Sequence, residues 1–84
     1  MIKSGECRFR MANKMTFGQF ARTRRRAANL SQAQVAEALG LVTRASVSKK
    51  ELGRMEWSLA DVMGLARALE VSASELLAEW EKSQ

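Results

Sequence analysis

The sequence predicts an all-α fold, a compact bundle of five short helices, and three observations lead to this class. Four hydroxyl residues stand three positions before a Gln, Asp or Glu and directly before an apolar stretch, which is the capping-box pattern of a helix start. Apolar residues then recur at spacings of three and four, as they do on one face of a helix. The 84 residues include no Pro, so no predicted helix is interrupted.

The capping boxes predict where four of the helices begin. They are Thr16 with Gln19, Ser31 with Gln34, Ser58 with Asp61, and Ser72 with Glu75. Asn29 and Gly40 can adopt the left-handed conformation that ends the first two helices. We therefore expect helices near residues 17–28, 32–39, 59–69 and 73–82.

A further helix is expected between the second and third of these. The segment TRASVSKK, residues 43–50, contains one large apolar residue, Val47, and Thr43 is available as its N-cap. We expect this helix to run from about residue 44 to residue 52 and to stop at Gly53. If Val47 points to the core, the outward face of this helix is polar and cationic.

The predicted core consists of apolar residues with helical spacing. They are Phe17, Phe20, Ala21, Val35, Ala36, Leu39, Val62, Leu65, Ala66, Leu69, Leu76, Leu77 and Trp80. Leu77 and Trp80 belong to the last helix, where a small domain has little chain left to cover them. An exposed apolar stripe on that helix would be a surface for a partner.

Charge is distributed unevenly along the chain. The net charge is +5, but residues 1–54 contain twelve Lys and Arg against three Asp and Glu, and residues 55–84 contain two against six. A cationic pole of this kind predicts a polyanionic partner, and we expect nucleic acid. A membrane surface would require bulky apolar residues opposite the basic ones, which the basic segments lack. We therefore expect no membrane partner and a cytoplasmic, nucleoid-associated protein.

The residue types argue against several kinds of site. With no His and a single cysteine, Cys7, the chain cannot assemble the usual zinc-ligand sets or an internal disulfide. Neither a catalytic triad nor a pair of carboxylates in a cleft is indicated, and no apolar run is long enough for a membrane span or a signal peptide. We expect no enzymatic activity, no metal, no cofactor and no small-molecule effector.

Residues 32–52 match the physical description of a helix-turn-helix, two short helices joined by a tight turn with the second polar and basic. The three runs LSQAQVAEALG, SVSKKELG and LARALEVSASELL resemble the Cro and phage-repressor (XRE) family of lambda-repressor-like DNA-binding domains, and the similarity covers residues 16–80. The resemblance implies a sequence-specific regulator, most simply a small phage- or plasmid-type repressor. Such a protein binds a palindromic operator in double-stranded DNA as a homodimer, through the major groove.

The resemblance also implies roles for individual residues. Contacts to bases are expected from Arg44, Ala45 and Lys49, because arginine can donate two hydrogen bonds to guanine and a methyl group can pack against thymine. Contacts to the DNA backbone are expected from Gln32, Ser31, Thr43, Ser46, Ser48, Lys50 and Arg54. Arg25 and Glu51 match the positions of a partly buried ion pair that joins the first helix to the third.

Two departures from the family pattern affect the third helix. Leu41 and Val42 both stand between the turn glycine and the N-cap, where the family usually has one residue. Choosing Thr43 as the cap keeps Val47 inward, whereas a rotated helix would exchange the outward residues with their neighbours. Lys50 occupies a position that is normally apolar or aromatic, and we expect its stem to pack while its ammonium reaches outward, toward a phosphate.

The domain organisation and the partners complete the prediction. Residues 16–82 are expected to form the DNA-binding domain, with a C-terminal dimerisation helix that uses Leu76, Leu77 and Trp80; core packing is the alternative for these residues. Residues 1–15 are expected to form a basic arm. Three alternatives are open for it: a flexible tail, a DNA-backbone contact, or a short strand at CRFRM that pairs with a second subunit. The rival function is an antitoxin-like or adaptor protein that binds a protein partner, with secondary DNA binding.

Overall fold

A computed structural model describes residues 15–41 and 43–84, and within these residues the chain is all-helical. The helices are α2 (Phe17–Ala27), α3 (Gln32–Leu39), α4 (Arg44–Glu51), α5 (Leu59–Ala68) and α6 (Ala73–Lys82). The predicted all-α class is confirmed, and the helix bounds agree with the expected ranges to within one residue at either end. The basic arm predicted for residues 1–15 lies outside the described residues, apart from Met15.

The capping chemistry predicted from the sequence determines where four helices start. At α2, α3, α5 and α6 the cap hydroxyl accepts the amide of the third helical residue, whose side chain in turn accepts the amide of the cap. The left-handed residues Asn29 (φ 61) and Gly40 (φ 75) follow α2 and α3 as expected. Thr43 precedes α4 in an extended conformation, but its hydroxyl makes no capping hydrogen bond. The capping hydrogen bond expected of Thr43 is therefore not made.

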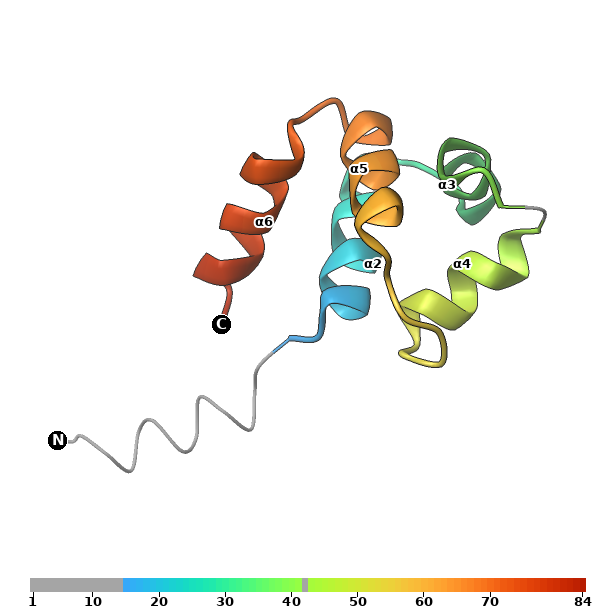
Figure 1. The fold of residues 1–84 in the computed structure, drawn as a ribbon, viewed down its shortest axis with the longest axis horizontal. Coiled ribbons are helices and arrows are strands. Elements are labelled where there is room, and N and C mark those ends of the chain that lie inside the picture. Colours follow the sequence, from blue (N-terminus) through green and yellow to red (C-terminus); the bar gives the residue numbers. More distant parts are fainter. Residues whose placement is uncertain (1–14, 42) are drawn as a thin grey trace, which may run out of the picture.

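The helices pack so that α3 and α4 form one end of the molecule. Helix α3 packs against both α4 and α5, α2 packs against α4, and α5 packs against α6 (Figure 1). In Figure 1, α6 lies on the side of α2 and α5 that is opposite to α3 and α4. The buried apolar residues are Phe20, Ala21, Val35, Ala36, Val47, Val62, Leu65, Ala66 and Leu76. The core thus draws on every described helix.

Helix α6 is attached to the start of α2 by aromatic packing. The Trp80 ring meets the Phe17 ring edge to face, with centroids 5.5 Å apart, and its Nε1 donates to the Met15 carbonyl at 3.1 Å. Leu76 has no exposed surface, and Leu77 is partly buried. The prediction that Leu76 contacts a second subunit is wrong, because the core of its own chain covers this side chain completely.

Gly18 permits the close approach of α2 and α4. A Cβ atom at this position would lie 2.5 Å from the Lys50 carbonyl oxygen and 2.6 Å from the Glu51 carbonyl oxygen. Because both obstacles are backbone atoms, a larger residue is accommodated only if the helices move apart. Sequence reasoning missed this role, although a glycine inside a helix, where alanine is more stable, was a signal for it.

We predict that Gly18→Ala destabilises the fold despite the better helix propensity of alanine. Alanine favours a helix interior by about 1 kcal/mol over glycine, but overpacking costs roughly 1–3 kcal/mol. Because both obstacles are backbone atoms, we expect a cost near the upper end and a net loss of about 2 kcal/mol. Urea denaturation followed by circular dichroism measures the difference. Thr23→Ala, an exposed change in the same helix, should stay within about 0.5 kcal/mol of the parent. An unchanged midpoint for Gly18→Ala would contradict the close contact.

Candidate nucleic-acid interface

The turn between α3 and α4 begins at Gly40. The Leu41 amide donates to the Ala36 carbonyl at 2.8 Å, which closes the end of α3. Val42 lies outside the described residues, and Thr43 follows it directly before α4. The two helices that this turn joins pack against each other. The sequence segment predicted as a helix-turn-helix therefore has two short helices that pack together and are separated by residues 40–43.

Helix α4 has one buried face and one open face. Val47 is fully buried, and Lys50 and Glu51 are each only 5% exposed. Arg44, Ala45 and Lys49 are exposed, and Ser46 and Ser48 are partly exposed. The rotation of α4 is therefore the one expected with Thr43 at the N-cap, and all three candidate base-contacting side chains are exposed.

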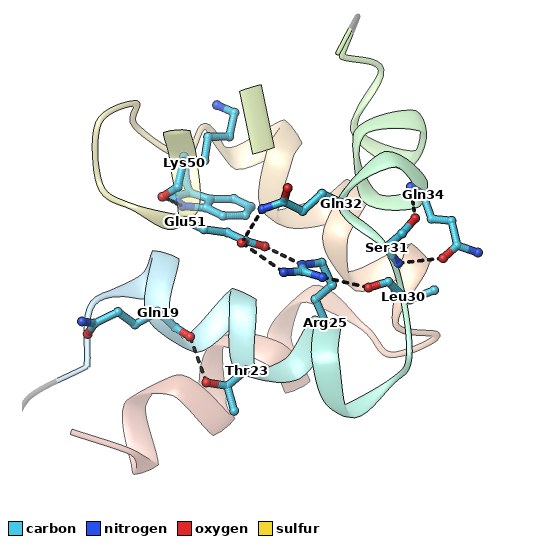
Figure 2. A network of polar contacts seen from close by, with 10 residues as sticks. Gln19, Thr23, Arg25, Leu30, Ser31, Gln32, Gln34, Lys50 and Glu51 are labelled. Atoms are coloured by element: carbon cyan, nitrogen blue, oxygen red, sulfur yellow. Dashed lines mark hydrogen bonds and ion pairs between the residues drawn. The ribbon is translucent and has the colours of Figure 1, made fainter. Parts of the chain in front are cut away.

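The carboxylate of Glu51 joins α4 to α2 and α3. Arg25 donates to it through Nε at 2.7 Å and through Nη2 at 3.3 Å, and Gln32 donates through Nε2 at 3.1 Å (Figure 2). Arg25 also donates through Nη1 to the Leu30 carbonyl, at 2.9 Å. The structure thus brings Arg25 and Glu51 together, both largely buried, and adds Gln32 to them. The Gln32 side chain braces α4, in addition to any contact it makes outside the chain.

The structure contradicts the role predicted for the Lys50 side chain. Its ammonium donates to Asp61 Oδ2 and to the Glu56 carbonyl, each at 2.7 Å, and both charged side chains of the pair are about nine-tenths buried. The prediction that this ammonium reaches outward to a phosphate is wrong. Lys50 follows Val47 by three positions and so lies on the same inward face of α4, where Asp61 offers a buried acceptor.

Asp61 accepts hydrogen bonds from two directions. Its Oδ2 accepts the Ser58 amide, as part of the α5 capping box, and the Lys50 ammonium. Burial raises the pKa of Asp61, but the hydrogen bonds from Lys50 and Ser58 and the positive charge of Lys50 outweigh burial, so the pKa lies below its ordinary value of 3.8. The Asp61 carboxylate is therefore ionised at neutral pH. Sequence reasoning read Asp61 as a capping residue alone.

Lys50 also attaches the segment between α4 and α5 to the end of α4. Trp57 donates through Nε1 to the Lys50 carbonyl at 3.1 Å, so the end of α4 is capped from the loop. Arg54, a predicted backbone contact, lies in this loop and is exposed. Of the other predicted backbone contacts, Ser31 and Thr43 are exposed, and the Ser31 hydroxyl already accepts the Gln34 amide at 3.0 Å.

A basic groove of about 570 Å³ runs between α2, α3 and α4. We use this name for the concave surface whose charged lining residues are Arg22, Arg25, Arg26, Arg44 and Glu51. Since Glu51 is paired with Arg25, the groove has a clear excess of positive charge. Arg22 and Arg26 were not among the predicted DNA contacts, although the sequence of residues 22–26, RTRRR, is strongly basic.

Comparison with known proteins agrees with this geometry. A family model described as a helix-turn-helix domain matches residues 16–80, which include α2 to α5 and most of α6. The predicted helix-turn-helix is thereby confirmed, whereas membership of the Cro and phage-repressor family stays a prediction. No curated protein matches the chain.

Candidate membrane spans and candidate metal sites are absent from residues 15–41 and 43–84. No helix there is long and apolar enough to cross a membrane. The same residues hold no group of three or more His, Cys, Asp or Glu side chains placed to bind a metal ion.

We predict that Asp61→Asn destabilises the fold at neutral pH and changes its pH dependence. The variant leaves the buried Lys50 ammonium without a counter-charge, and losing one partner of a buried pair costs about 3–5 kcal/mol. Because the folded pKa of Asp61 lies below its unfolded value, its contribution to stability is present above about pH 4 and is lost as the pH falls through the folded pKa.

Thermal denaturation between pH 7 and pH 2 measures both effects. The difference in stability between parent and Asp61→Asn should shrink as the pH falls below about 4. Glu56→Gln is the matched control, since the Glu56 side chain is exposed and only its carbonyl contacts Lys50. Parallel curves for the parent and Asp61→Asn would contradict the ionised pair.

Proposed function

The chain belongs to the helix-turn-helix domain family, and we propose that it is a sequence-specific transcriptional regulator that inserts α4 into the major groove of double-stranded DNA. The division of α4 into a buried and an open face carries this proposal. Arg44 and Ala45 lie in its first turn, which is the part of a recognition helix that reaches base edges. Their side chains are exposed, while the opposite face of the helix is anchored in the core.

Each side chain on the open face has a partner of suitable chemistry in the major groove. The Arg44 guanidinium donates in parallel to O6 and N7 of a guanine, and the Ala45 methyl packs against a thymine methyl. Lys49 reaches a guanine or a phosphate one turn further along the helix. The Thr43 hydroxyl, which caps no amide of α4, is available to donate to a phosphate.

We propose repression as the regulatory role and a palindromic operator as the site. Repression requires only that the protein occupy DNA which the polymerase needs, whereas activation requires a further surface that contacts the polymerase. One such domain covers a half-site, and two copies related by a two-fold axis read half-sites about 34 Å apart. The proposed assembly on DNA is therefore a homodimer.

The dimer contact that we propose differs from the one expected on α6. Trp80 already donates to Met15 and packs on Phe17, so it offers little free apolar surface. The large exposed apolar side chains lie instead beside the end of α4 and along the first half of α5. They are Leu52, Met55, Leu59 and Met63, which we call the α5 patch.

The α5 patch suits a second copy of this chain. Leu52 belongs both to the patch and to the lining of the basic groove, so the patch adjoins the surface that faces DNA. A copy bound to the next half-site approaches along the DNA, beside the basic groove. Across a two-fold axis, the apolar side chains of the α5 patch can pack on the same side chains of the second copy. Leu59 is 71% exposed, which is the largest exposure in the patch.

We predict that Arg44→Ala weakens operator binding and relaxes base preference at one position. The loss should be roughly 1–3 kcal/mol on the preferred sequence and smaller on random DNA. Selection of bound sites from random duplexes, followed by titration, measures both. Arg67→Ala is the control, because Arg67 is exposed on α5 and does not line the basic groove. Equal losses on both DNAs would restrict Arg44 to phosphate binding, and failure of the parent to enrich any sequence would refute the proposed function.

We also predict that Leu59→Ser converts the dimer to a monomer at micromolar concentration. Because Leu59 is mostly exposed in the single chain, the change should leave the fold stable to within about 0.5 kcal/mol. Sedimentation velocity measures the assembly state. Leu77→Ser provides the comparison for α6 and should remain dimeric. A monomeric parent, or a dimer lost only in Leu77→Ser, would overturn the proposed contact.

A further inference from the structure

The basic groove continues onto the exposed side of α2. A second concave surface, of about 400 Å³, is lined by Met15, Gln19, Arg22, Thr23 and Arg26. Arg22 and Arg26 line both concavities, so the two surfaces meet at this pair. The two residues are four positions apart and lie one above the other on the same face of α2.

The four arginines of α2 differ in their partners. Arg25 is buried against Glu51, and Arg24 forms an ion pair with Glu79 of α6. Among the described residues, neither Arg22 nor Arg26 has an acidic partner, and both are exposed. Two like charges at this spacing repel each other by a few tenths of a kcal/mol. An anion bound between or beside them would remove that repulsion.

The position of this pair indicates which anion it binds. Arg44, at the N-terminal end of α4, lines the same basic groove as Arg22 and Arg26. Positive charge therefore extends from the start of the proposed recognition helix, across the groove, and along α2. The acidic Glu79 belongs to α6 and pairs with Arg24, two positions away from Arg22 and from Arg26. An extended anion that passes the start of α4 would follow this path, whereas a compact anion would occupy only part of it.

We propose that Arg22 and Arg26 bind neighbouring phosphates of the DNA strand that borders the major groove entered by α4. Four residues of helix separate the two side chains by about 6 Å along α2, so each can contact a phosphate of its own. Guanidinium groups bind phosphate through paired hydrogen bonds. This inference rests on the proposed function, and it adds to that function a binding site on α2, outside the helix-turn-helix.

The test is the salt dependence of DNA binding by the Arg22→Ala/Arg26→Ala double variant. Each lost phosphate contact should reduce the slope of log affinity against log salt concentration by about 0.9, or about 1.8 for both. Between 50 and 200 mM salt, the variant should then lose about tenfold less affinity than the parent does. The slope should change equally on the selected operator and on random duplex DNA, and base preference should be unchanged. Fluorescence anisotropy measures the affinities.

Arg24→Ala is the matched control, because it removes the same charge from the same helix at a residue paired with Glu79. Its slope should equal that of the parent. The single variants Arg22→Ala and Arg26→Ala should each give about half of the change, which guards against misfolding of the double variant. A parental slope in the double variant, or an equal reduction in Arg24→Ala, would overturn this inference while leaving the proposed function intact. Failure of the parent to bind duplex DNA would overturn both.

Discussion

The position of α4 depends on one buried carboxylate. Glu51 lies on the last turn of α4 and accepts hydrogen bonds from Arg25 of α2 and Gln32 of α3. A carboxylate that is 5% exposed is tolerated only while its partners satisfy it, since an unpaired buried charge is far more costly than the pair. Rotation of α4 in either direction would break these bonds. The outward direction of Arg44 and Ala45 is thus a consequence of the inward direction of Glu51.

A second buried ion pair and a close backbone contact act at the same end of α4. Lys50 pairs with Asp61 of α5, so two adjacent residues of α4 with opposite charges are bound by different helices. The carbonyls of these same two residues meet Gly18 of α2. Buried ion pairs add little net stability compared with apolar residues, but they accept few alternative geometries. Their effect here is to define one orientation of α4, which pre-organises its open face for binding.

The parts of this structure that follow from local chemistry were predictable from the sequence. Capping boxes depend on residues three positions apart, and the inward direction of Val47 depends on helical spacing, so both could be inferred from short segments. Lys50 was misassigned because its partner belongs to another helix, and no spacing rule relates the two. Leu76 was misassigned because periodicity identifies an apolar face without identifying what covers it. The role of Gly18 depends on a contact between helices, which a glycine alone does not specify.

In the proposed complex, the arginines of α2 connect the DNA backbone to α4. Arg25 fixes α4 through Glu51, and Arg26 is the next residue of the same rigid helix. In the proposed complex, a phosphate bound at Arg26 is therefore held at a set distance from the open face of α4. Contacts to phosphates carry no sequence information, but they determine the register in which base-contacting side chains meet the groove. Within the proposed complex, the Arg25 and Glu51 pair contributes to base recognition by fixing α4, although both side chains are largely buried.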